Sequence, residues 1–334
     1  RIGLTAAANE VDGFALSAVR PAGDPAPRQV TAGALDERGR RIADAVLSFG
    51  PGQTTASGRM EVPFELRNDF SAIVIDGQPQ AGAVRVLDEN SKRRRIGLLS
   101  QAEADQAQPL LSPLYYIRRA LEPFADLVEP TSPDLAEAIP QLLDQKPAII
   151  MMADVGTIPP TAHAQLLDWV EKGGTLVRFA GSRMAAGSGE DELLPVRLRT
   201  GERSLGGTLS WTVPQAVTEF PPTGPFADLA PPNEVTVSRQ ILAEPTPDIV
   251  ERTWATLADG TPLVTGAARG KGMIALFHVT PEATWSNLPI SGTFVEMLRR
   301  IVQLARNQGV IAVSAEGQVA TLPPYRMIAA NGAL

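Results

Sequence analysis

Two residues capable of proton chemistry lie just after an apolar segment over residues 272–277: His278 follows it directly, and Glu282 lies four residues further on. A histidine can take up or release a proton near neutral pH, and a nearby carboxylate can orient its ring through a hydrogen bond. The apolar segment is typical of a buried strand that ends at His278. Because ligands in open α/β sheets gather at the carboxyl ends of strands, we expect any active site at this edge. The structural alternative is a hydrogen-bonded histidine at a sheet edge.

A serine at the end of another predicted strand supplies a candidate nucleophile. Ser182 follows the strand predicted over residues 175–180. The Gly-x-Ser-x-Gly pattern of a nucleophile elbow is absent around it. A triad of Ser182 with His278 and either Glu282 or Asp154 is therefore one hypothesis. The other is a polar strand end whose hydroxyl satisfies the amides of a loop.

Three further residues are candidates for contact with a ligand at the same edge. Asp154 ends the most apolar segment of the chain, over residues 148–153. Arg183 follows the serine, and Trp285 follows the histidine segment and could wall a pocket. The structural alternatives are loop or helix capping for Asp154 and anchoring of the loop for Trp285. His163 is predicted on the surface of a helix that starts at two prolines.

Composition excludes several classes of function. The 334 residues include no cysteine, so disulfides, thiolate nucleophiles and cysteine-based metal sites are all excluded. Only two histidines occur, without the His-x-x-x-His spacing of a zinc site, and we expect no metal and no cofactor. The net charge of −7 argues against a nucleic-acid partner, since phosphate binding needs a basic surface. No apolar run reaches the length of a membrane span.

The elements that would position these residues alternate between strands and helices after residue 94. Apolar strand-like segments are separated by amphipathic segments with helical spacing. This order predicts an α/β fold with a doubly wound, mostly parallel sheet of the flavodoxin type. The expected strands cover residues 95–100, 148–153, 175–180 and 272–277, and the expected helices cover residues 111–124, 132–143, 159–170 and 293–307.

The chain divides into regions of different composition. Residues 1–92 contain short alternating strands between Gly/Pro/Asp turns, which predicts a small all-β sandwich of the immunoglobulin-like kind. Residues 93–309 form the α/β domain, with a β-rich insertion at about 187–247 lying over one sheet edge. Residues 310–334 are expected to be a C-terminal extension. The start at Arg1, without an initiator methionine, suggests a piece of a longer protein.

The segment Phe-His-Val-Thr-Pro-Glu over residues 277–282 resembles the His/Glu end of the class I glutamine amidotransferase fold. That family has His-Pro-Glu at this point, and both residues belong to a Cys-His-Glu triad. The present chain inserts Val279 and Thr280, so Glu282 departs from the spacing of the family. It also lacks the cysteine that attacks the amide, so glutaminase chemistry by that mechanism is excluded.

Five further segments, together with the short β-domain before them, carry a broader resemblance: residues 93–98, 113–124, 277–280, 285–289 and 294–300. The resemblance covers most of residues 30–325. It is to bacterial membrane proteins with an aerotolerance-regulator (BatA-like) N-terminal membrane region and a C-terminal domain of the DUF4159 type. This resemblance implies a soluble region of a membrane-anchored protein at the periplasmic face of a bacterial inner membrane.

These observations support three functional expectations. The first is a non-catalytic binding or interaction module, a pseudoenzyme, whose partners are other envelope proteins or other domains of the full-length chain. The second is a hydrolase with Ser182 as nucleophile and His278 as base. The third is a small-molecule or glycan sensor that uses the strand-end cleft of the α/β domain. In each case the membrane would be reached only through segments outside this chain.

Overall fold

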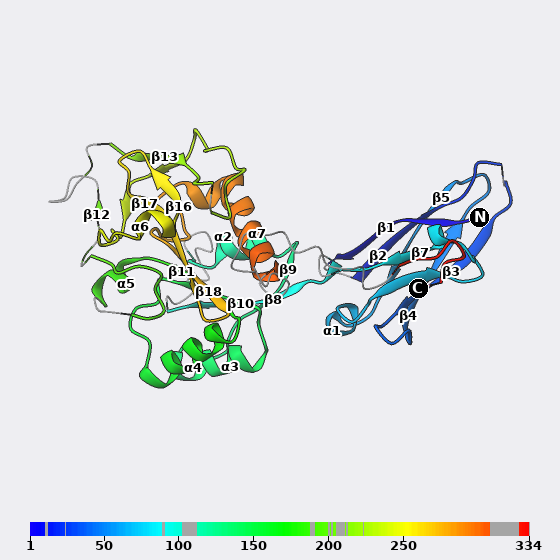
Figure 1. Cartoon of the computed structure of the whole chain (residues 1–334), viewed down its shortest axis with the longest axis horizontal. Helices are drawn as coiled ribbons and strands as arrows, with labels where there is room; N and C mark the ends of the chain where they lie inside the picture. The colour runs from blue at the N-terminus through cyan, green and yellow to red at the C-terminus, as the bar shows by residue number, and fades with distance from the viewer. Residues whose placement is uncertain are drawn as a thin grey trace. The chain divides into compact units, whose positions relative to one another are not determined.

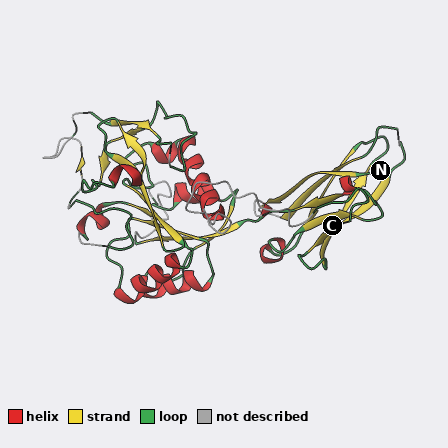
Figure 2. Cartoon of the chain, viewed as in Figure 1, coloured by secondary structure: helices red, strands yellow, loops and turns green. Residues whose placement is uncertain are grey.

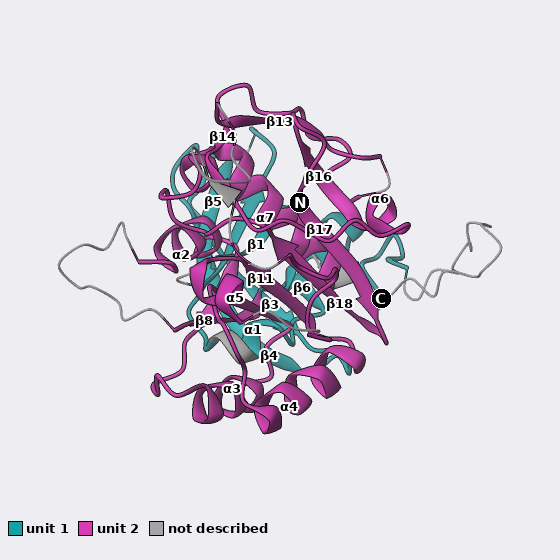
Figure 3. Cartoon of the chain, turned by 90° about the vertical axis from the view of Figure 1, so that its left-hand side faces the viewer, with its two compact units in different colours: residues 1–93, 313–334 teal, residues 94–312 magenta. Residues whose placement is uncertain are grey.

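A computed structural model of the chain divides into two compact units (Figure 1, Figure 3). Unit 1 holds residues 1–93 and 313–334, and unit 2 holds residues 94–312, so the first break falls within one residue of the expected one. The described residues are 1–10, 13–23, 25–88, 91–101, 112–187, 191–199, 201, 203–204, 211, 213–222, 224–307 and 327–333.

Unit 1 is built mainly from antiparallel strands (Figure 2). One sheet has the order β1-β2-β5 and the other has the order β4-β3-β6-β7. The strands are β1 (Gly3–Glu10), β2 (Gly13–Val19), β3 (Arg28–Leu35), β4 (Arg41–Phe49), β5 (Thr55–Met60), β6 (Ala72–Ile75) and β7 (Val84–Val86), with the short helices α1 (Phe64–Arg67) and η1 (Ala81–Ala83).

The two sheets of unit 1 share one hydrophobic core. In β4 every second residue is buried, including Ala45, Leu47 and Phe49, while the residues between them face outward. This is the period-two pattern of a strand with one face on a core. Phe14 of β2 and Ile73 of β6 belong to the same cluster, so both sheets bury their inner faces together.

The end of the chain returns to unit 1. The Ala81 amide donates to the Ala330 carbonyl at 3.1 Å, and Gly332 adopts a left-handed φ of +81° close to the Gln80 carbonyl. Residues 313–334 thus cluster with the β-rich unit, within the range 310–334 that the sequence analysis named as a C-terminal extension. Of the expected extension, only residues 327–333 are among those described.

Unit 2 is organised around a nine-stranded sheet with the order β14-β13-β16-β17-β18-β11-β10-β8-β9. The strands from β18 to β9 run parallel to one another. Their central members are apolar on both faces, as a sheet covered by helices on both sides requires. These strands are β8 (Arg94–Ser100), β9 (Ala125–Val128), β10 (Ile149–Ala153), β11 (Thr175–Phe179) and β18 (Gly272–Phe277).

Helices cover both faces of this sheet (Figure 2). Helices α2 (Tyr115–Leu121) and α7 (Gly292–Asn307) pack on one face, and α3 (Leu135–Asp144) and α4 (Pro160–Glu171) pack on the other. The Asp134 carboxylate caps α3 by accepting from the Ala136 amide at 3.0 Å, and Pro160 opens α4. The described residues contain no helix long and apolar enough to cross a bilayer.

The other half of the sheet is antiparallel, which corrects the expectation of a mostly parallel sheet. Strands β16 (Thr253–Leu257) and β17 (Pro262–Arg269) form a hairpin beside β18, and β13 (Gln215–Glu219) and β14 (Thr236–Val237) extend the sheet beyond it. Part of the predicted insertion therefore continues the sheet rather than lying over its edge. The remaining elements are β12 (Arg203–Ser204), β15 (Arg239–Gln240), α5 (Ser182–Ala186), α6 (Ile249–Arg252) and η4 (Leu288–Ile290).

Candidate functional site

Three neighbouring parallel strands bring the sequence-predicted residues to one edge of unit 2. Asp154 follows β10, Ser182 follows β11, and His278 follows β18. Backbone hydrogen bonds hold the three strand ends together: the Asp154 amide donates to the Phe179 carbonyl at 3.0 Å, and the Ala180 amide donates to the Phe277 carbonyl at 2.8 Å. The carboxyl ends of the strands thus meet, as the rule for open α/β sheets requires.

His278 is fully buried, and both of its ring nitrogens are engaged inside the protein. Nδ1 lies 2.7 Å from the carbonyl oxygen of Ile241, and Nε2 lies 3.1 Å from the hydroxyl of Thr265. A carbonyl can only accept, so Nδ1 carries the proton of the neutral ring and Nε2 accepts from the Thr265 hydroxyl. Neither nitrogen is left to bond Ser182 or Glu282.

Burial also makes His278 a poor base. Removal from water disfavours the charged ring and lowers the pKa of His278 to about 4, although the Ile241 carbonyl partly opposes this. At neutral pH the ring is therefore uncharged and already donates its only proton to the backbone. In this arrangement the histidine joins β18 and β17 to the segment around Ile241.

Asp154 holds the loop after β11 in place. Its Oδ1 accepts from the amides of Arg183 at 3.0 Å and Met184 at 3.1 Å, and its Oδ2 lies 3.5 Å from Nη1 of Arg183. Asp154 has a left-handed φ of +46°, a conformation that aspartate tolerates better than most residues. A side chain at Gly181 would collide with this carboxylate. Burial raises the pKa of Asp154, and the contacts with Met184 and Arg183 oppose that shift.

Ser182 and Arg183 are the exposed members of this edge. Ser182 is the first residue of α5, and the hydrogen bonds of His278 go to Ile241 and Thr265 instead of to this serine. Arg183 thus forms an ion pair with Asp154, while the ring of His278 forms its hydrogen bonds with buried groups of the fold.

Glu282 is paired with its own loop. Its Oε1 accepts from the Thr284 hydroxyl at 2.8 Å, and the Thr280 hydroxyl reaches its backbone carbonyl at 3.4 Å. Burial raises the pKa of Glu282, and the negative charge of Asp154 adds a smaller rise. Neither nitrogen of His278 bonds to Glu282.

Trp285 belongs to the hydrophobic core. Only 3% of its surface is exposed, and it packs in a cluster with Met184 and Ile241. Its carbonyl accepts from the Ser238 amide at 2.8 Å and from the Ser238 hydroxyl at 2.9 Å. This places Trp285 in the role of loop anchor that the sequence analysis gave as its structural alternative.

A buried ion network that the sequence analysis missed lies on the α4 face of the sheet. Arg178 of β11 is 1% exposed, donates to the Val155 carbonyl at 2.8 Å and pairs with the Asp191 carboxylate. Nε2 of His163 lies 2.9 Å from the other oxygen of Asp191, so His163 is half-buried and bonded rather than a free surface residue. Burial pushes the pKa of Asp191 upward, but Arg178, the Leu193 amide and His163 together leave it below its usual value.

The signal for this network was present in the sequence. Arg178 is the one charged residue in the strand Thr175–Phe179, and a charge in such a strand needs a partner. The partner, Asp191, lies beyond α5 and could not be identified from spacing. Among the described residues, no group of three or more His, Asp or Glu side chains is arranged to hold a metal ion.

Comparison with known proteins leaves the family of the chain open. No protein-family model and no curated protein matches it. Among solved structures, a ThuA-like protein from Bacteroides uniformis is similar to this chain, with 13% sequence identity and a TM-score of 0.42. The aligned region covers 64% of this chain and 91% of the ThuA-like protein. A ThuA-like protein from Parabacteroides merdae has 14% identity and a TM-score of 0.40, and the aligned region covers 70% of this chain and 94% of that protein. A cold-adapted β-galactosidase from Rahnella sp. R3 has 14% identity and a TM-score of 0.36, and the aligned region covers 56% of this chain and 28% of the β-galactosidase.

Proposed function

We propose that the chain is a non-catalytic binding or interaction module. The observation that supports this most directly is the state of His278: its ring is fully buried, and both nitrogens are engaged by Ile241 and Thr265. A general base must reach the proton that it removes, either directly or through one water molecule. With no cysteine in the chain and no free histidine nitrogen at this edge, the residues support binding better than covalent catalysis.

We assign unit 2 to the flavodoxin-type, glutamine amidotransferase-like folds and unit 1 to the immunoglobulin-like sandwiches. Numbered in chain order, the parallel strands β8, β9, β10, β11 and β18 have the spatial order 2-1-3-4-5. This order supports the first assignment. For unit 1, the support comes from two antiparallel sheets with one shared core.

The face that we propose for contact is the exposed part of the strand-end edge, at Ser182 and Arg183. Arg183 is about half exposed, with 49% of its side chain accessible, and its guanidinium is positioned by Asp154. Such a face can bind a polar group of a partner without chemical change. The partners that we propose are other envelope proteins or other domains of the full-length chain, at the periplasmic face of a bacterial inner membrane.

The hydrolase alternative is tested by labelling with a fluorophosphonate, which reacts with activated serines. We expect no labelling of the wild-type chain and no difference between it and Ser182→Ala in hydrolysis of p-nitrophenyl acetate. Labelling that is lost in Ser182→Ala but kept in Ser204→Ala would overturn the non-catalytic function. Release of ammonia from glutamine, checked alongside, is expected to stay at background.

The interaction function is tested by crosslinking. A photoreactive amino acid at Arg183 of the full-length protein in its native host should crosslink to an envelope protein or to another domain of the same chain. The matched control carries the same photoreactive residue at Lys172, an exposed residue of the α4 end. Equal crosslinking patterns from both positions would contradict a specific face at Arg183.

A further inference from the structure

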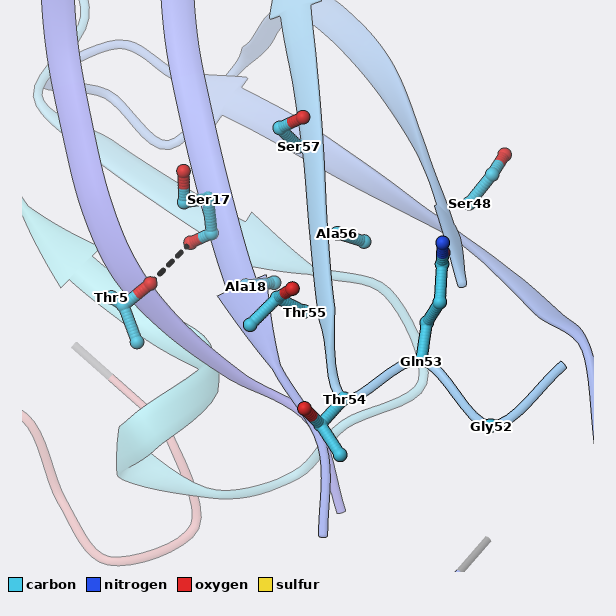
Figure 4. Close-up of a pocket in the computed structure, with 10 residues that line it drawn as sticks. All are labelled: Thr5, Ser17, Ala18, Ser48, Gly52, Gln53, Thr54, Thr55, Ala56 and Ser57. Carbon is cyan, nitrogen blue, oxygen red and sulfur yellow. Dashed lines mark hydrogen bonds between the residues drawn. The ribbon is translucent and has the colours of Figure 1, made fainter. Parts of the chain in front are cut away.

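Unit 1 contains a hollow in its outer surface that is lined by hydroxyl groups (Figure 4). Its volume is about 680 Å³, within the range of small-ligand pockets. The walls come from β1, β2, β5, the end of β4 and the turn before β5, and none of the lining residues carries a charge. Six of them have hydroxyl side chains: Thr5, Ser17, Ser48, Thr54, Thr55 and Ser57.

The hydroxyl groups of the hollow differ in whether they bond to other described residues of the protein. The Thr5 hydroxyl donates to the Ser17 carbonyl at 3.2 Å, as the dashed line in Figure 4 shows. Within the part of the chain that the structure describes, the hydroxyls of Ser48, Thr55 and Ser57 form no hydrogen bond to protein. These three side chains are exposed. They are therefore available to a ligand once bound water is displaced.

The wall of the hollow next to Ser48 is held rigid by a buried arginine. Arg20 is 5% exposed, and its guanidinium donates to the carbonyls of Gln53 at 2.7 Å and Gly50 at 3.0 Å, and also to that of Ala26. The Gly50 amide in turn donates to the side-chain oxygen of Gln53 at 2.9 Å. Ordering the turn in advance reduces the entropy that binding would otherwise cost.

The register of the sheet fixes the hydroxyls relative to one another. Ser17 of β2 lies directly opposite Ser57 of β5, and Val19 lies opposite Thr55. Residues two apart on a strand share a face, so Thr55 and Ser57 face outward together while Ala56 between them is buried. Gly58 packs so closely on the Val46 carbonyl of β4 that a side chain there would collide, which brings the β4 edge beside β5.

We propose that this hollow is a binding site for an uncharged carbohydrate. An anionic ligand would find no cation among the lining residues, and an apolar ligand would leave the hydroxyls of the walls unpaired. A neutral sugar chain presents hydroxyls that both donate and accept, as serine and threonine hydroxyls do. The site lies in unit 1 and does not rest on the function proposed for unit 2.

The test is isothermal titration calorimetry of the whole chain with four named oligosaccharides. The neutral probes are maltohexaose, cellohexaose and the hexamer of N-acetylglucosamine, and the charged probe is hexagalacturonic acid. We expect at least one neutral probe to bind with a Kd of about 1 mM or lower, and more tightly than the charged probe. Absence of binding by all three neutral probes would overturn the proposal, as would tighter binding of the charged one.

Variants locate the binding. The double variant Ser48→Ala/Ser57→Ala should weaken the binding of the neutral probe, raising its Kd by about tenfold, since two hydrogen bonds to the ligand are lost. Thr55→Val should raise the Kd of the neutral probe by about threefold. The control Thr161→Ala removes an exposed hydroxyl on α4 and should leave the affinity unchanged. Binding that is unchanged in the double variant would place the sugar elsewhere and overturn the proposal; calorimetric melting of each variant checks that unit 1 stays folded.

Discussion

The strand-end edge of unit 2 and the hydroxyl-lined hollow of unit 1 use polar side chains in opposite ways. At the edge, His278, Asp154 and Glu282 are residue types associated with catalysis, yet each is bonded to its own fold. In the hollow, Ser48, Thr55 and Ser57 are chemically plain, but among the described residues their hydroxyls bond to nothing in the protein. A polar group that the fold already satisfies stabilises the protein, and a group that it leaves unsatisfied can serve a ligand.

If this comparison is right, substitutions in unit 2 should cost stability and those in the hollow should not. All four tryptophans, Trp169, Trp211, Trp254 and Trp285, lie in unit 2, so their fluorescence reports the unfolding of that unit. Unit 1 has none and is followed by calorimetry or by hydrogen exchange of its strands.

The largest effect is expected from Asp191→Ala. It leaves the guanidinium of Arg178, which is 1% exposed, without its anionic partner, and breaking a buried pair from one side costs about 3 kcal/mol. Urea unfolding followed by tryptophan fluorescence measures this loss. The control Glu192→Ala breaks an exposed pair with Arg269 and should cost no more than about 1 kcal/mol. Equal losses would mean that the buried network is not a special contributor.

The second effect is a pH dependence that comes from His278. Its pKa is about 4 in the fold and 6.5 when unperturbed, so the unfolded chain binds more protons between these values. Stability from this group is complete above pH 6.5 and is lost as the pH falls toward 4, by roughly 3 kcal/mol in total. The raised pKa values of Asp154 and Glu282 act in the opposite direction, since stability from those groups is lost as the pH rises.

The variant His278→Gln separates these contributions. Urea unfolding of wild type and variant between pH 4 and 6.5 should give a difference that shrinks as the pH falls, because only the wild type loses the neutral-ring contribution. A constant difference across this range would show that the histidine is not held neutral by burial.

A smaller effect is expected where Asp154 orders the loop after β11. Asp154→Ala removes the acceptor for two backbone amides and places alanine at a left-handed φ, which together cost about 1 to 2 kcal/mol. Asp154→Asn keeps an oxygen acceptor and a residue that tolerates this φ, so its loss should stay within about 0.5 kcal/mol. Similar losses for both variants, measured by urea unfolding, would refute the capping role.

The smallest effects are expected from a matched pair of threonine-to-valine substitutions, one in unit 2 and one in the hollow of unit 1. Thr265→Val removes the buried hydroxyl that donates to His278 and should cost unit 2 about 1 kcal/mol. Thr55→Val removes an exposed hydroxyl of the hollow and should change the stability of unit 1 by no more than about 0.5 kcal/mol. If Thr55→Val costs as much as Thr265→Val, the hollow is a structural feature and the comparison fails.

The elements of the fold followed from local patterns more readily than their connections did. The apolar segment that became β18 and the helix over residues 292–307 were visible from periodicity, and the break after the first β-rich region fell within one residue. The continuation of the sheet through β13 and β14 was not visible, because both strands are short and lie in a segment rich in turn residues. The return of the chain end to unit 1 depends on a contact between Ala81 and Ala330, which no local signal predicts.

The same division applies to the candidate site. The sequence placed His278, Asp154 and Ser182 after strands, and parallel strands bring such positions to one edge. The role of His278 depended on its hydrogen bonds to Ile241 and Thr265. The role of Arg178 depended on its ion pair with Asp191. These partners come from the hairpin strand β17 and from the segments after α5 and β15, so spacing along the chain could not identify them.

By itself the sequence determined the alternation of strands and helices in unit 2 and excluded thiolate chemistry, since a residue type that is absent cannot react in any fold. Only the tertiary structure decided which polar groups are already satisfied. The physical reason is that periodicity is a local property of the chain, whereas burial and hydrogen bonding of His278 or Ser57 depend on segments that meet only after folding.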